Sequence, residues 1–365
     1  MNNAIIAIDI GTTNIEAVLA DSSGNDIEYK SVRNEQRRFG SDVAARICAA
    51  TDGHADEMRV SVLSQICEII TAFVTGHPDI NVTNVAIAGN TTMLHLLMGY
   101  DCSGLGLFPF TPVSLDPVST TTHELIADFL DGENSGLPEL PVTILPGISA
   151  YLGADIYAGA VALGLGRMSP SDDQVLSAPN EQTNLLVDLG TNAELILGNS
   201  RRLLAASAAA GPAFESNRIF KGTEGIEMLH RLLTLGVIDK TGLMGEEYFE
   251  KLAQKNIRKL QLAKAAIRAA ISVLLEKYGI GARDVANIFV SGNFGNHLDE
   301  TACIAVGMFP QEFAGRIKAV GNTVLKGCIE YILQPADRIP LSLFEEVVLA
   351  NEESFNDLLM NSIYL

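Results

Sequence analysis

The sequence predicts an α/β protein of two lobes, built from two copies of one structural unit. The phrase AIDIGTT, residues 7–13, follows an apolar run at the start of the chain, and LVDLGTN, residues 186–192, repeats it near the midpoint. Each copy opens a series of three strand-like segments that is followed by alternating helices and strands. The length of 365 residues suits two domains of ordinary size.

The first half predicts an antiparallel meander followed by helices and buried strands. Alternating or apolar runs separated by turn residues predict strands at 3–11, 14–21 and 26–32. Helical periodicity covers 58–74, and the apolar run 84–89 predicts a buried strand that leads into a helix at 91–99. The segment 101–141 is rich in Pro, Gly, Ser and Thr, which favours a surface region.

The second half repeats this plan after a polar loop. Strands are predicted at 184–190, 193–198, 202–208 and 285–292, and helices at 225–235, 259–278 and 322–333. We therefore expect a first lobe at 1–150, a connecting helix at 151–166, a second lobe at 167–320, and a second connecting helix with an acidic tail at 321–365.

Composition excludes several classes of function. The formal charge of −19 repels nucleic acids and anionic membranes. The five cysteines are scattered without a C-x-x-C pair, so we expect reduced thiols and no iron–sulfur cluster in this chain. The apolar stretch 144–166 is interrupted by Asp155, which favours a buried helix of small residues. The N-terminus lacks a secretory pattern, and we expect a cytoplasmic protein.

The repeated phrase has the chemistry of a phosphate-binding corner. Glycine permits close backbone approach, so that N–H groups can point at phosphate oxygens, and the hydroxyls add donors. An aspartate repels phosphate but can hold Mg²⁺ or its waters, which places Asp9 and Asp188 as metal ligands and catalytic residues. The other predicted phosphate contacts are Gly11, Thr12, Thr13, Gly190, Thr191 and Asn192. A single copy would be explained as an ordinary turn, but two matching copies favour a site for one nucleotide.

Further residues have two interpretations each. Asp155 either faces a cleft, where it serves catalysis, or caps a helix N-terminus. Lys264 and Arg268 lie one helical turn apart and either frame a base or ribose or belong to a solvated helix face. Asn90, with Thr91 and Thr92, is either a site at a strand end or a helix start. Gly211, Pro212 and Glu215 are either a turn near the ribose or a structural turn.

At these residues the chain resembles the superfamily that joins actin, the DnaK-type chaperones and the sugar kinases. The resemblance implies a two-lobed, duplicated ribonuclease-H-like fold with an interdomain nucleotide cleft. It also implies that 151–165 and 322–333 are connecting helices, and that VSGNFGN at 290–296 is an adenosine motif. The residues of that motif carried over as nucleotide contacts are Gly292, Asn293, Phe294 and Gly295.

The chain is more specifically similar to the ATPase portion of the reductive activators of corrinoid proteins. The phrases LPGISAYLGADIYAG, AAAGPAFES, LQLAKAAIRAAI and GNFGNHLD carry this likeness, which covers nearly the whole chain. It implies ATP and Mg²⁺ as ligands, and a corrinoid protein or corrinoid-dependent methyltransferase as partner. An N-terminal ferredoxin-like domain is expected to be lacking, so that a separate chain donates the electrons; a homodimer is left open. A small-molecule kinase and a nucleotide-sensing adaptor without turnover are the alternatives.

Overall fold

The computed structural model confirms the predicted α/β fold with two sheets. It describes residues 2–127, 137–167, 182–190, 192–211, 224–245, 254–292 and 298–365. The chain divides into two compact units, each of which takes a piece from the C-terminal part of the sequence: unit 1 holds 1–164 and 323–338, and unit 2 holds 165–322 and 339–365.

The sheet of unit 1 has six strands in the order β3-β2-β1-β4-β6-β5. The central strand β1 is buried along its middle because Ala4 to Ile8 are all apolar, and it pairs antiparallel with β2 and parallel with β4. A strand buried on both faces is expected to be a continuous apolar run. The strands are β1 (Asn2–Ile10), β2 (Asn14–Asp21), β3 (Asp26–Arg33), β4 (Ile80–Gly89), β5 (Val118–Thr121) and β6 (Pro141–Ile144).

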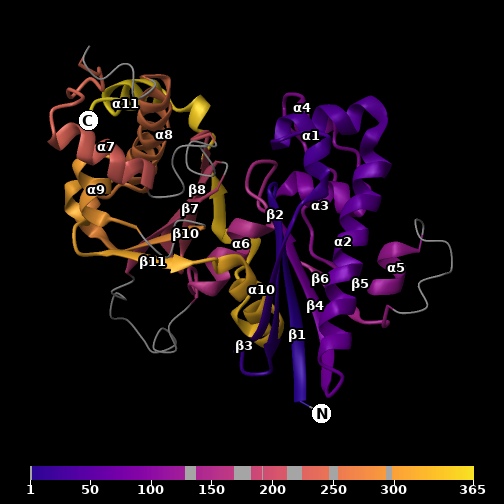
Figure 1. The fold of residues 1–365 in the computed structure, drawn as a ribbon. Helices are drawn as coiled ribbons and strands as arrows, with labels where there is room; N and C mark the ends of the chain where they lie inside the picture. Colours follow the sequence, from indigo (N-terminus) through magenta and orange to yellow (C-terminus); the bar gives the residue numbers. More distant parts are fainter. Residues whose placement is uncertain are drawn as a thin grey trace. The chain divides into compact units, whose positions relative to one another are not determined.

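Helices cover both faces of this sheet (Figure 1). α10 (Thr323–Leu333) and α6 (Ala154–Ala162) lie against β1 and β4 on one face, and α2 (Ala55–Gly76) and α3 (Thr91–Met98) lie on the other. The predicted connecting helices at 151–165 and 322–333 thus form, with α6 shorter than expected. Smaller elements of unit 1 are η1 (Glu35–Arg38), α1 (Val43–Ala49), η2 (Ala50–His54), α4 (Ser103–Gly106), α5 (Thr122–Ile126) and η6 (Pro335–Asp337).

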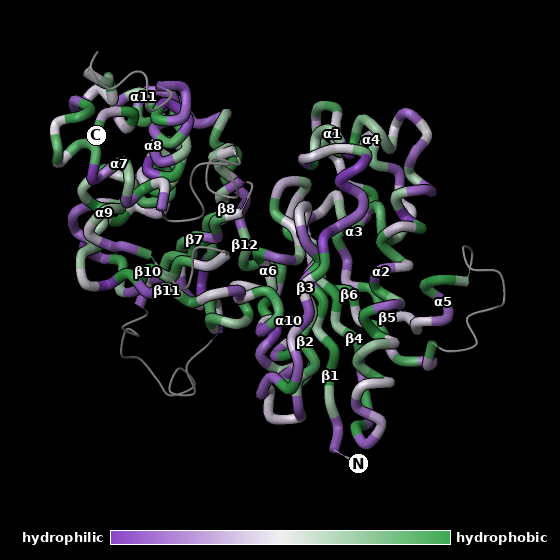
Figure 2. The backbone as a smooth tube through the Cα atoms, viewed as in Figure 1, coloured by the Kyte–Doolittle hydropathy of each residue, from purple (hydrophilic) through white to green (hydrophobic). Residues whose placement is uncertain are grey.

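The sheet of unit 2 has the order β11-β10-β7-β8-β9-β12. Its inner strands are apolar, as the hydropathy colours of Figure 2 show, and they pack with α8 (Gln254–Tyr278) into one core. The strands are β7 (Thr183–Leu189), β8 (Ala193–Asn199), β9 (Arg202–Ala208), β10 (Val285–Gly292), β11 (Ile317–Gly321) and β12 (Phe344–Glu346). The other helices are α7 (Glu224–Thr234), α9 (Glu300–Ala305), α11 (Phe355–Asn361) and the short η4 (Ala282–Asp284), η5 (Gln311–Phe313), η7 (Leu341–Leu343) and η8 (Leu349–Asn351).

The two sheets repeat one topology, down to single residues. Strands β3-β2-β1-β4-β6 of unit 1 correspond in order to β9-β8-β7-β10-β11 of unit 2. Asp9 lies opposite Glu16, which lies opposite Ser31; Asp188 lies opposite Glu194, which lies opposite Ser207. The predicted duplication is therefore confirmed in strand order and in register.

Among the residues that the structure describes, one helical region is apolar enough to span a membrane by length and composition, and it is not the stretch 144–166 singled out from the sequence. It is Val43–Gly76, and half of its most apolar window is buried inside the protein. Its α2 portion buries residues such as Met58, Leu63 and Phe73, as a helix in the core of a folded domain does.

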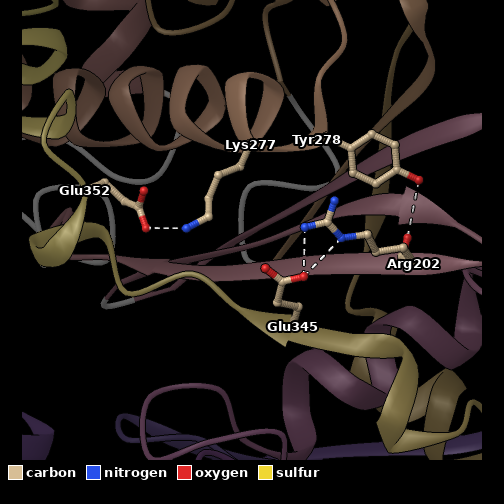
Figure 3. Close-up of polar contacts among 5 residues, drawn as sticks. All are labelled: Arg202, Lys277, Tyr278, Glu345 and Glu352. Atoms are coloured by element: carbon tan, nitrogen blue, oxygen red, sulfur yellow. Dashed lines mark hydrogen bonds and ion pairs between the residues drawn. The ribbon is translucent and has the colours of Figure 1, made fainter.

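The C-terminal segment of unit 2 is held to its sheet and to α8 by polar contacts (Figure 3). Arg202 on β9 donates from Nε and Nη2 to Glu345 Oε2 on β12, at 3.0 and 2.8 Å. Lys277 on α8 forms an ion pair with Glu352 at 2.5 Å, and the Tyr278 hydroxyl donates to the Arg202 carbonyl at 3.5 Å. This segment is thus an integral part of unit 2.

Candidate functional site

The first phosphate motif forms a tight corner between β1 and β2. A Cβ atom at Gly11 would lie 2.8 Å from the carbonyl oxygen of Asn14, so only glycine fits at this position. Thr12 is buried and Thr13 is exposed. Glycine is therefore required at position 11 by the turn itself, and close approach of a phosphate to this backbone stays a prediction.

The backbone carbonyl groups of Gly11, Thr12 and Thr13 each accept a hydrogen bond from Asn34 or Arg46. Asn34 Nδ2 donates to Gly11 O at 2.8 Å, and the Asn34 backbone N–H donates to Thr13 O at 2.9 Å. The guanidinium of Arg46 donates through Nη2 to Thr12 O. Asn34 and Arg46 are both fully buried, so the corner rests on an internal polar network rather than on solvent.

Asp9 is the last residue but one of β1, just before this corner. Its negative charge, after the larger effect of burial, helps to raise the pKa of the Cys328 thiol on α10 well above the usual value. Asp9 and Glu16 also act on Tyr29, whose pKa is raised chiefly by burial. Asp9 and Glu16 thus put two acidic groups on neighbouring strands beside the corner.

Asn90 begins a helix, one of the two interpretations that the sequence left open, and its side chain also contacts Thr12 of the first corner. Its Oδ1 accepts from Met93 N at 3.0 Å, which caps α3, and its Nδ2 donates to Thr12 Oγ1 at 3.2 Å. Thr91 Oγ1 donates to Ser149 O at 2.7 Å. A helix start and a contact to the phosphate corner therefore coincide in one side chain.

Asp155 lies in the first turn of α6, directly beside the end of β4. Gly153 precedes this helix, and a Cβ there would lie 2.5 Å from Asn90 Cα, so the helix start packs closely on the β4–α3 junction. Asp155 Oδ1 accepts from Ile156 N at 2.8 Å, a contact with the positive end of the helix dipole. Asp155 thus lies in the first turn of α6 but is not its N-cap, which is Gly153, and the catalytic interpretation remains a proposal.

At the second corner, the carboxylate of Asp188 accepts a hydrogen bond from the hydroxyl of Ser291. Ser291, fully buried on β10, lies opposite Asp188 on β7 and donates from Oγ to Asp188 Oδ2 at 2.7 Å. Burial raises the pKa of Asp188, and the bond from Ser291 opposes that rise. Gly190 N donates to Asn192 O at 2.9 Å and closes the turn. Ser291 therefore stabilises the charged form of the carboxylate.

Gly292 brings the adenosine motif close to Asp188. It has a φ of +92°, and a Cβ would lie 2.4 Å from Leu189 O and 3.2 Å from Asp188 Oδ1. Gly211 also has positive φ, at +69°, and no described atom beyond its chain neighbours lies within 4 Å of the point where a Cβ would stand. The predicted contacts that lie outside the described residues are Thr191, Pro212, Glu215, Asn293, Phe294 and Gly295.

Lys264 and Arg268 lie on α8, under the C-terminal segment. Lys264 is fully buried, and its ammonium donates to the carbonyl of Tyr364. Burial, and secondarily the charge of Arg268, lower the pKa of Lys264 to about 8. Burial lowers the pKa of Arg268, and Glu312 opposes this. In the described chain neither cation belongs to a purely solvated face, and their role at a nucleotide remains a proposal.

The residue types of the two corners fit Mg²⁺ bound together with phosphates. Each corner offers an aspartate beside a glycine turn, and Mg²⁺ usually takes one or two carboxylates while keeping waters and phosphate oxygens as its other ligands. Within the described ranges, no group of three or more His, Cys, Asp or Glu side chains is arranged to hold a metal by itself. Asp9 and Asp188 are the residues that would hold Mg²⁺.

Sequence reasoning missed Asn34, Arg46 and Ser291. Arg46 stands in an ordinary amphipathic stretch, where arginine is normally exposed, so no local pattern marks it as buried. Ser291 was included only within the adenosine motif, although its place opposite Asp188 follows from parallel pairing of β7 and β10.

Two sheets of the same strand order, each with an aspartate–glycine corner after its first strand, define an actin-like, ASKHA-type fold. Two family models match this chain: "RACo middle region" over residues 5–168, and "C-terminal domain of RACo the ASKHA domain" over 182–228 and 237–365. The chain belongs to the RACo family, of which it carries the middle region and the C-terminal ASKHA domain.

Relatives and solved structures agree with this assignment. The corrinoid activation enzyme RamQ of Eubacterium limosum is 28% identical over 90% of this chain and 64% of its own length. The [Co(II) methylated amine-specific corrinoid protein] reductase of Methanosarcina barkeri is 24% identical over 96% of this chain and 75% of its length. A solved reductive activator for a corrinoid, iron–sulfur protein superposes on all of this chain and 66% of its own, with a TM-score of 0.82 and 24% identity. The chain thus spans about two thirds of RamQ and of that structure.

Proposed function

We propose that the chain binds and hydrolyses ATP, with the two aspartate–glycine corners as its sites for MgATP. The observation that carries this proposal is the duplicated row of Asp9 with Glu16 and Asp188 with Glu194 beside glycine corners. Asp9 and Asp188 hold Mg²⁺, and the metal supplies charge neutralisation at the phosphates. The backbone of Gly11 to Thr13 and of Gly190 to Asn192 binds the phosphate oxygens.

Catalysis in this proposal consists of positioning and electrostatics. Asp155, Asp9 or Asp188 orients the attacking water, and the donors of the two corners stabilise charge on the transferred phosphoryl group. Asp188 must be ionised to act, and the hydrogen bond from Ser291 favours that state. Gly211, Pro212, Glu215, Lys264, Arg268 and 292–295 contact the nucleoside.

We propose further that nucleotide turnover drives a change of shape that a corrinoid partner senses. The names of the relatives support this: one is a corrinoid activation enzyme and another a reductase of a Co(II) corrinoid protein. The partner is a corrinoid protein or its methyltransferase, the electrons come from another chain, and the setting is the cytoplasm.

The test is phosphate release with and without a cobalt(II) corrinoid protein, under a chemical reductant. Stimulated release together with formation of cobalt(I), followed by absorbance, is the expected result. Phosphorylation of a metabolite would identify a kinase instead, and tight ATP binding without release would identify an adaptor. The Asp9→Asn variant, which keeps the side-chain shape but loses the charge, is the control and should abolish the stimulated release.

A further inference from the structure

Among the described residues, Arg46 is a buried cation without an anionic partner in contact with it. Its donors go to Thr12 O, to Gly40 O at 3.2 Å, to Gln36 Oε1 at 3.3 Å and to Met93 Sδ at 3.0 Å, and none of these acceptors is charged. Asp42, the N-cap of α1, acts on its charge from a distance. Burial lowers the pKa of Arg46 to about 10, which keeps the guanidinium protonated at neutral pH.

A fully buried, unpaired charge is costly, because desolvation is not repaid by an opposite charge. Neutral polar groups satisfy the hydrogen bonds of Arg46, and its positive charge is offset only from a distance, by Asp42. The guanidinium lies directly behind the corner, since Nη2 contacts the carbonyl of Thr12. An anion bound at this corner would supply the missing charge.

The hydrogen bond from Arg46 to the Thr12 carbonyl also fixes the direction of the Thr13 N–H. In a trans peptide the carbonyl oxygen and the amide hydrogen point to opposite sides. The Thr12 carbonyl points inward to Arg46, so the N–H of Thr13, on the same peptide unit, points away from it. A carbonyl that accepts from a cation is polarised, and this strengthens the N–H as a donor. Asn34 fixes the peptides on both sides in the same way, through Gly11 O and Thr13 O.

We propose that Arg46 is a positioning residue for phosphate binding: it fixes the Thr12–Thr13 peptide and polarises its N–H toward a bound polyphosphate. The inference rests on the proposed function, because it needs the first corner to bind phosphate. The ligand class is a nucleoside triphosphate or another polyphosphate with Mg²⁺. Arg46 itself does not touch the ligand.

The test is calorimetric titration of the whole chain with MgATP, magnesium tripolyphosphate and adenosine. Arg46→Met should weaken MgATP and tripolyphosphate by about 10- to 100-fold, the value of one charge-assisted hydrogen bond. Adenosine affinity should change less than about twofold, because adenosine has no phosphate. Arg59→Met is the matched control: Arg59 Nε also donates to a backbone carbonyl, Leu97 O at 3.0 Å, but away from the corner. Its MgATP affinity should match the wild type.

Other outcomes separate the two proposals. If the wild type binds MgATP and Arg46→Met binds it equally well, or loses adenosine and ATP in the same proportion, the Arg46 inference is overturned and the proposed function stands. If the wild type binds neither MgATP nor tripolyphosphate, both are overturned. If Arg46→Met does not fold, Arg46→Lys decides: an ammonium cannot reach Thr12 O and Gln36 at once, so MgATP should weaken about 3- to 10-fold. Unchanged MgATP affinity in that variant overturns the positioning role.

Discussion

Replacing Gly292 by alanine tests how closely the adenosine motif approaches Asp188. Two costs add at this position. The φ of +92° is strained for any residue with a Cβ, at about 1–2 kcal/mol. The new Cβ would also lie 2.4 Å from Leu189 O, and forced crowding of this kind costs about 1–3 kcal/mol more. The expected loss of unfolding free energy is therefore about 2–5 kcal/mol.

Gly279→Ala is the matched control for this prediction. Gly279 follows α8 in the same unit with a φ of +80°, and beyond its own chain neighbours no atom lies within 4 Å of the point where a Cβ would stand. It should lose only the strain, about 1–2 kcal/mol. Urea unfolding followed by circular dichroism measures both variants. Equal losses in the two variants would refute the close packing of Gly292 on β7.

Two further predictions concern the helix contact in unit 1 and the carboxylate in unit 2. Gly327→Ala should destabilise the protein by about 2 kcal/mol or more, because a Cβ would lie 1.9 Å from Ala158 O and this crowding outweighs the roughly 1 kcal/mol gain in helix propensity. The control is Gly76→Ala in α2, whose Cβ would meet only Glu28 Oε2 at 4.0 Å and which should not destabilise the protein. Equal thermal unfolding of the two variants would contradict the tight contact between α6 and α10. Burial raises the pKa of Asp188, so the folded chain holds this proton more tightly than the unfolded chain; its stabilising effect is present below pH 3.8 and is lost as the pH rises through the raised pKa. In the absence of Mg²⁺, Asp188→Asn should remove this loss of stability with rising pH, because asparagine does not ionise. The difference in unfolding free energy between the variant and the wild type should therefore grow as the pH rises above 3.8. A difference that stays constant with pH in urea unfolding would disprove the raised pKa of Asp188.

The positions of most strands could be predicted from the sequence, because in these strands the apolar residues of the local pattern are the ones that the fold buries. The predicted strands 14–21, 202–208 and 285–292 match β2, β9 and β10 to the residue. The repeated corner also predicted the shared topology, since the same meander requires the same pairing. By contrast, the short β5 and the placement of α5 in the segment 101–141 depend on pairing with β6, which no local pattern encodes.

The candidate site was predictable in its acidic and glycine residues but not in what supports them. Asp9, Gly11 and Asp188 stand in a motif, whereas Asn34 and Arg46 reach the corner from elements distant in sequence. Lys264 illustrates the same limit: no local pattern indicated that long-range packing brings the Tyr364 carbonyl to its ammonium. Tertiary contacts between distant segments decide such cases, and a single sequence carries no direct record of them.

The most direct test of the central claim is the stoichiometry and carboxylate dependence of MgATP binding, measured by calorimetry. The proposal predicts one MgATP per chain, with binding weakened at least about tenfold by Asp9→Ala and by Asp188→Ala alike, because each removes one carboxylate proposed to hold Mg²⁺. Binding that survives in either variant at wild-type strength, or two independent nucleotides per chain, would contradict the assignment of both carboxylates to the binding of one MgATP.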